Sequence, residues 1–133
     1  MKYKYKRYGQ ETLRPVIEIK VKSSDRALKY HALVDSGADI SIFHAEVADY
    51  LGINLSKGKK DIVTGVGGKS SEFFLHKVVV EVGGWEHEIE VGFLPVIGGR
   101  SVTYGILGQK GFFENFVVKF DYKKGEIELK PRK

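Results

Sequence analysis

The chain has 133 residues, of which 42% are hydrophobic and 12% aromatic; this predicts one globular domain with a real core and excludes two full lobes. It has no cysteine and only four scattered histidines, so we expect no disulfide, no metal site and no cofactor. The net charge of +5 would favour nucleic acid or acidic partners if it were gathered on one face, but much of it lies at the two chain ends.

The N-terminus is basic and aromatic, and Lys alternates with Tyr over most of residues 2–8. This period of two predicts an edge strand that faces solvent or another subunit, in preference to nucleic acid. We expect residues 1–12 to form a separate N-terminal segment ahead of a domain over 13–133. Neither a secretory signal nor a membrane span of about 20 apolar residues is evident, so we expect a soluble, cytoplasmic protein.

Strands dominate the first half of the chain. Residues 15–22 alternate apolar and polar side chains, which predicts a half-buried strand paired in a hairpin with 27–34. Residues 40–43 predict another buried strand. A short helix is expected over 44–51, ending at Gly52, because glycine suits the position just after a helix.

The middle of the chain predicts two hairpins. After a polar loop over 54–60, residues 61–75 form two strand-like arms around a glycine-rich tip, and 76–91 form a hairpin that turns at Gly83-Gly84. Gly68-Lys69-Ser70 resembles the end of a phosphate-binding loop. Val63 replaces the first glycine of that motif and a strand follows where a helix is needed, which excludes nucleotide binding.

The last third combines short apolar segments. Residues 104–109 place an apolar pair between glycines, which predicts a short buried strand beside another backbone. Residues 110–116 predict a short helix with its phenylalanines inward. A final hairpin is expected over 116–129, with its turn at 123–125.

The stretch with most chemical content is Leu33-Val34-Asp35-Ser36-Gly37-Ala38-Asp39, which holds Asp35 in a tight turn between two strands. A carboxylate on a rigid, partly desolvated loop can have its pKa moved to suit acid or base chemistry. The same three residues, Asp-Ser-Gly, are also favoured in ordinary turns. Taken alone, the triplet favours the turn interpretation.

The order of these motifs resembles the retropepsin-like aspartic proteases, the single-lobe relatives of pepsin. An Asp-Ser-Gly loop is followed after about thirty residues by the glycine-tipped hairpin, and then by Ile106-Leu107-Gly108, a short helix and a last hairpin. The resemblance covers residues 16–129. It implies an all-β fold, a closed β-barrel with a flap hairpin and one or two short helices.

The resemblance also assigns roles. It implies that Asp35 is the catalytic aspartate, that Ser36 braces the two active-site loops across a dimer axis, and that the carbonyl of Gly37 meets the substrate. Gly108 ends the segment that packs beneath the catalytic loop. Gln109 stands where retropepsins often carry Arg, and its amide is a candidate hydrogen-bond donor to Asp39. The implied substrate-binding residues are Gly37, Ala38, Asp39, Val66, Gly67, Gly68 and Ile106.

Two functional classes remain open from the sequence. The first is a homodimeric aspartic endopeptidase that hydrolyses extended peptides with water activated between two symmetry-related copies of Asp35. The second is a catalytically silent module on the same scaffold, which dimerises or binds peptides and offers a basic surface to an acidic partner. The intact Asp35-Ser36-Gly37 favours the first.

Overall fold

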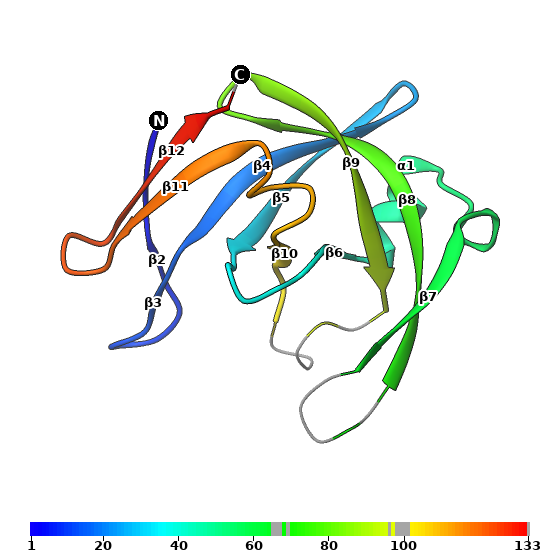
Figure 1. The fold of residues 1–133 in the computed structure, drawn as a ribbon, viewed down its shortest axis with the longest axis horizontal. Helices are drawn as coiled ribbons and strands as arrows, with labels where there is room; N and C mark the ends of the chain where they lie inside the picture. The colour runs from blue at the N-terminus through cyan, green and yellow to red at the C-terminus, as the bar shows by residue number, and fades with distance from the viewer. Residues whose placement is uncertain (65–67, 69, 96, 98–101, 133) are drawn as a thin grey trace.

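Strands account for most of the computed structural model, which describes residues 1–64, 68, 70–95, 97 and 102–132 (Figure 1). Two short helices accompany them, α1 (Ala45–Leu51) and the 3₁₀ helix η1 (Leu55–Lys57). The strands are β1 (Lys2–Lys4), β2 (Lys6–Arg7), β3 (Leu13–Arg14), β4 (Val16–Ser23), β5 (Arg26–Val34), β6 (Ser41–His44), β7 (Lys59–Thr64), β8 (Ser70–Val82), β9 (Trp85–Leu94), β10 (Gly105–Leu107), β11 (Phe116–Asp121) and β12 (Glu126–Pro131).

Six of these strands close into a barrel. They are hydrogen-bonded in the order β4-β5-β10-β6-β9-β8, and β8 pairs back with β4 to complete the circle. β7 lies outside the circle and pairs only with β8 among the strands of this sheet, so the β7–β8 hairpin projects beyond the barrel (Figure 1). The predicted all-β barrel with a projecting hairpin and short helices is confirmed.

The apolar alternation in the sequence explains which faces turn inward. In β4 the side chains of Ile17, Ile19 and Val21 are buried, whereas Glu18 between them is exposed. β5 also buries alternate residues, namely Tyr30, Ala32 and Val34, so it is half-buried. Apolar side chains from both halves of the chain form the main core, including Phe43, Phe93, Phe112 and Phe116.

Helix α1 ends where the sequence predicts. Gly52 follows it with φ +75°, a left-handed conformation that glycine adopts without strain, and its N–H donates to the carbonyls of Ala48 and Asp49. Val47 and Leu51 are buried on the inner face of the helix. The polar loop expected over 54–60 is wrong in part, because it contains η1 and the first residues of β7.

The helix predicted over 110–116 is also wrong. A chain of turns replaces it because Gly111 has φ +95°, and the N–H groups of Phe113 and Glu114 reach back five residues to Gly108 and Gln109. The inward direction of Phe112 and Phe116 is confirmed, since both are buried with their rings stacked at 5.1 Å. Phe113 is half-buried.

The chain ends form a second, three-stranded sheet in the order β1-β12-β11. Lys2 and Lys4 point to solvent while Tyr3 packs against the main core, so the predicted edge strand is confirmed for β1. It does not extend over residues 2–8, because β2 pairs with β3 in a separate two-stranded sheet. Figure 1 shows the β11–β12 hairpin running beside the barrel, with both chain ends close to this sheet. Within the described residues, no helix has the length and apolarity that crossing a membrane requires.

Candidate active site

The loop that carries Asp35 is built on strand β10. β10 runs parallel to β5, with Leu107 opposite Val34, and antiparallel to β6, with Ile106 opposite Ile42. It therefore separates the two strands that the loop connects. This insertion fixes both ends of the loop against one short segment near the end of the chain.

Three hydrogen bonds hold Asp35 itself. Its backbone N–H donates to the carbonyl of Leu107 at 3.0 Å, and its carbonyl accepts from the N–H of Ala38 at 3.2 Å. Its side-chain Oδ1 accepts from the N–H of Gly37 at 2.9 Å, which fixes the direction of the carboxylate. The residue is half-buried, and the adjacent Ser36 and Gly37 are exposed. The structure thus presents a held carboxylate at an accessible surface.

Gly108 allows this loop to lie directly on β10. A Cβ atom at this position would stand 2.2 Å from the carbonyl oxygen of Ile40 and 2.7 Å from that of Ala38, closer than any side chain tolerates. Its N–H donates to the hydroxyl of Ser41 at 3.0 Å, and that hydroxyl donates to the carbonyl of Lys110 at 2.9 Å. Ser41 is completely buried, so this small network is shielded from water.

Gln109 contacts the loop in a way that differs from the bond to Asp39 considered from the sequence. Its side-chain Nε2 donates to the carbonyl of Ser36 at 2.6 Å. Its backbone N–H donates to the carbonyl of Ala38 at 2.8 Å, and the next residue, Lys110, donates its N–H to the carbonyl of Asp39. Asp39 is exposed at the end of this ladder.

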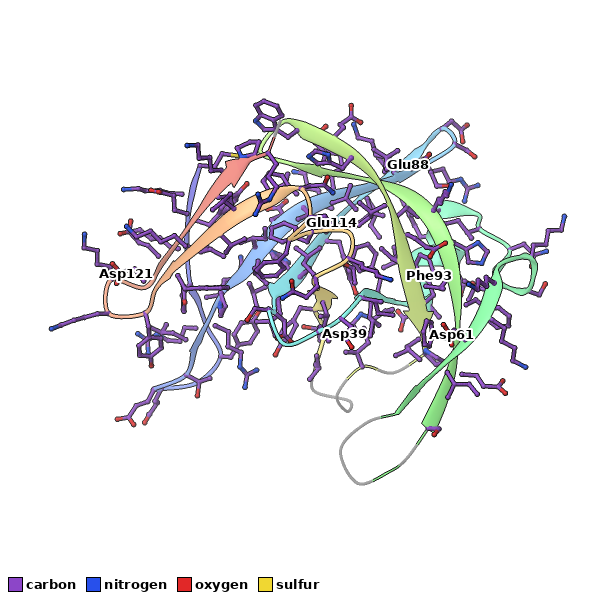
Figure 2. All side chains as sticks on the ribbon, viewed as in Figure 1. Asp39, Asp61, Glu88, Phe93, Glu114 and Asp121 are labelled. Atoms are coloured by element: carbon purple, nitrogen blue, oxygen red, sulfur yellow. The ribbon has the colours of Figure 1, made fainter. Side chains whose placement is uncertain are left out.

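A cleft of about 470 Å³ opens beside Asp39. Its walls include Ile40 from the loop, Asp61 from β7 and Phe73 from β8, so it lies between the loop and the base of the projecting hairpin. Figure 2 labels Asp39 and Asp61, which stand on these two separate elements. Its lining combines apolar side chains, such as Ile40 and Phe73, with charged side chains of both signs.

The remaining predicted site residues lie in different places. Ile106 is half-buried in β10 and packs against the smaller apolar cluster around Ile42 and Phe73. Gly68 is exposed with φ +80° and has no atom within 4 Å of a Cβ added there. Val66 and Gly67 lie outside the described residues.

A larger cleft of about 650 Å³ lies elsewhere, between β5 and helix α1, and Asp35 is not among its lining residues. Its polar centre is Tyr30, whose hydroxyl lies 2.5 Å from Nδ1 of His44 and accepts the backbone N–H of His44. Burial raises the pKa of Tyr30 well above the ordinary value for tyrosine. The neutral hydroxyl of Tyr30 donates to Nδ1 of His44, so Nε2 of His44 donates to the carbonyl of Val102. The polar groups of Tyr30 and His44 are therefore hydrogen-bonded to protein partners.

Sequence reasoning missed one residue of this region and misassigned another. Ser41 stands alone as a polar residue in an apolar run, and that pattern is a usable signal for a buried hydroxyl with backbone partners. The partner of Gln109 depends on the distance between two loops, so no local pattern could have identified Ser36.

Comparisons with known proteins identify the family and the fold of the chain. Residues 18–110 match the family model described as aspartyl protease. No curated protein shows significant sequence similarity to the chain. The EIAV protease complexed with the inhibitor HBY-793 is a similar solved structure, 23% identical with a TM-score of 0.55 over 77% of this chain and 88% of that one.

A retropepsin-like aspartic protease from Rickettsia conorii is similar over a longer part of the chain. It is 19% identical with a TM-score of 0.67, and the match covers 97% of this chain and 89% of that one. The structural similarity to both proteins shows that the fold is retropepsin-like, and at sequence identities this low it shows the fold alone.

Proposed function

This chain is a member of the aspartyl protease family, and we propose that it acts as a homodimeric aspartic endopeptidase in which Asp35 meets its symmetry mate. The observation that carries the proposal is the support of Asp35. A half-buried carboxylate is fixed by the Gly37 N–H and by β10, on a loop whose later residues Asp39 and Ile40 line the cleft of about 470 Å³.

The homodimer follows from the chemistry. Peptide hydrolysis of this class uses two carboxylates about 3 Å apart, which cannot both ionise and therefore share one proton. The sequence contains a single Asp-Ser-Gly. None of the aspartates outside this loop is followed by Ser-Gly or Thr-Gly; they are Asp25, Asp49, Asp61 and Asp121. The second carboxylate then comes from a second copy of the chain across a two-fold axis.

In this mechanism the two copies of Asp35 divide the work. The ionised carboxylate takes a proton from a water held between the pair as that water attacks the peptide carbonyl. The protonated carboxyl donates to the carbonyl oxygen, and the titration belongs to the pair as a unit. No covalent intermediate forms.

Neighbouring residues take supporting roles in the proposal. The exposed hydroxyl of Ser36 braces the two loops across the axis, the carbonyl of Gly37 accepts from substrate backbone, and Asp39 binds the substrate backbone at the edge of the cleft. Ile106 and Ala38 contribute contacts around the scissile bond. Residues 66–68 at the tip of the β7–β8 hairpin close over the peptide, excluding water and aligning it as an added strand.

The decisive test compares the wild-type protein with Asp35→Asn on a peptide library between pH 3 and pH 8. Asp25→Asn is the matched control, because Asp25 is exposed at the opposite end of the same strand, in the turn before β5. We expect cleavage by the wild type and by the control and none by Asp35→Asn. A salt-sensitive affinity for nucleic acid without cleavage would instead favour the silent module.

Sedimentation at micromolar concentration tests the dimer separately. We expect a two-fold dimer wherever peptide is cleaved. A monomer that still cleaves peptide would contradict the shared-proton mechanism.

A further inference from the structure

Gln109 is bonded to the Asp35 loop on both sides of Gly37. Its side-chain Nε2 donates to the carbonyl of Ser36 at 2.6 Å, and its backbone N–H donates to the carbonyl of Ala38 at 2.8 Å. One residue therefore holds the Ser36–Gly37 and the Ala38–Asp39 peptide groups of this loop. Gln109 is in turn carried by Gly108, whose close packing on the loop leaves it little freedom to shift.

The bond to Ser36 acts on the same peptide group that holds the carboxylate. The carbonyl of Ser36 and the N–H of Gly37 belong to one planar peptide, and that N–H donates to Oδ1 of Asp35 at 2.9 Å. Fixing the oxygen of a planar group fixes the direction of its N–H. A donor at the oxygen also polarises the peptide and strengthens the N–H as a donor.

We propose that Gln109 is a positioning residue for Asp35, acting through the Ser36–Gly37 peptide to hold the carboxylate in the direction it needs. The proposal rests on the proposed protease function for its effect on turnover. The chain of two hydrogen bonds, from Nε2 of Gln109 to Oδ1 of Asp35, stands on geometry alone.

Three substitutions at this position separate hydrogen bonding from bulk. Gln109→Leu keeps approximate size and removes the donor, and Gln109→Glu keeps the shape but places a carboxylate against the carbonyl of Ser36. Gln109→Arg supplies a new donor on a longer side chain, so it is the rescue variant. The matched control is Gln10→Glu, since Gln10 is exposed between β2 and β3, away from the loop.

The first measurement is the amide resonance of Gly37 in ¹⁵N-labelled protein, which does not depend on activity. Its nitrogen shift reports the donor on the Ser36 carbonyl, and its proton shift reports the bond to Asp35. We expect both shifts to change in Gln109→Leu and Gln109→Glu, to return toward wild type in Gln109→Arg, and to stay unchanged in Gln10→Glu. Unchanged Gly37 shifts in Gln109→Leu would overturn the proposal.

The second measurement is steady-state cleavage of a peptide that the wild type hydrolyses. Loss of one hydrogen bond that orients a catalytic group predicts a fall in kcat of roughly three- to tenfold in Gln109→Leu, with KM within about twofold. Gln109→Arg should recover most of kcat. A loss carried by KM alone, or wild-type kcat despite shifted Gly37 resonances, would overturn the positioning role. A wild type without peptidase activity would refute the protease function, while the Gly37 shifts still decide the hydrogen-bond chain.

Discussion

Replacing Gly108 by alanine should destabilise the protein more than its single added methyl suggests. The new Cβ would lie 2.2 Å from the carbonyl oxygen of Ile40 and 2.7 Å from that of Ala38, and both obstacles are backbone. The loop must therefore move by about an ångström, and such overpacking costs about 1–3 kcal/mol. The movement also strains the buried bond from the Gly108 N–H to Ser41, which adds about 1 kcal/mol.

The sum is a loss of about 3 kcal/mol in the free energy of unfolding, which for a chain of this length corresponds to a fall in Tm of roughly 10 °C. Urea unfolding and thermal melting followed by circular dichroism measure both quantities. The control is Gly125→Ala, at φ +65° in the turn between β11 and β12, where a Cβ has no atom within 4 Å.

That control should cost only the left-handed strain of a non-glycine residue, about 1–2 kcal/mol. The two variants therefore separate collision from backbone conformation. If Gly108→Ala proved as stable as Gly125→Ala, the loop would not rest on β10 as described, and the account of how Asp35 is supported would be refuted.

Two further predictions concern buried hydroxyl groups. Ser41→Ala leaves the N–H of Gly108 and the carbonyl of Lys110 without their buried partner, so we expect a loss of about 2 kcal/mol in urea unfolding. Ser56→Ala, an exposed hydroxyl, should change stability by less than about 0.5 kcal/mol, and equal losses would contradict the role of the buried network. Because burial raises the pKa of Tyr30, the folded protein keeps this proton while the unfolded chain releases it near pH 10, so stability should fall as pH rises above about 10. In an ultraviolet absorbance titration Tyr30 should ionise last, as the protein unfolds, and Tyr30→Phe should remove this final step; loss of an earlier step instead would contradict the burial argument.

Local chemistry explains why some elements could be predicted. Gly52 and the pair Gly83-Gly84 all have positive φ, which glycine alone adopts freely, so a helix end and a two-residue hairpin turn follow from the sequence. Apolar alternation likewise identified the inner face of β4. These signals depend on neighbouring residues only.

The features that were predicted wrongly or missed depend on packing between segments that are distant in the sequence. The phenylalanine spacing over 110–116 is helical, but the packing of Gly111 with a positive φ redirects the backbone into turns. The closure of the barrel between β4 and β8 joins residues about sixty positions apart, and no local pattern specifies it. The partner of Gln109 is also a long-range contact, seventy-three residues away at Ser36.

The position of β10 between β5 and β6 sets an order of assembly. The parallel pairing of Leu107 with Val34 and the bond from Asp35 to Leu107 join segments that lie far apart in the sequence. During synthesis the Asp35 loop cannot take its native conformation until residues 105–108 have emerged from the ribosome, because these residues pair with β5 and pack against the loop. Truncation before Gly105 therefore yields a chain that contains every residue of the Asp-Ser-Gly loop yet lacks the strand that supports it.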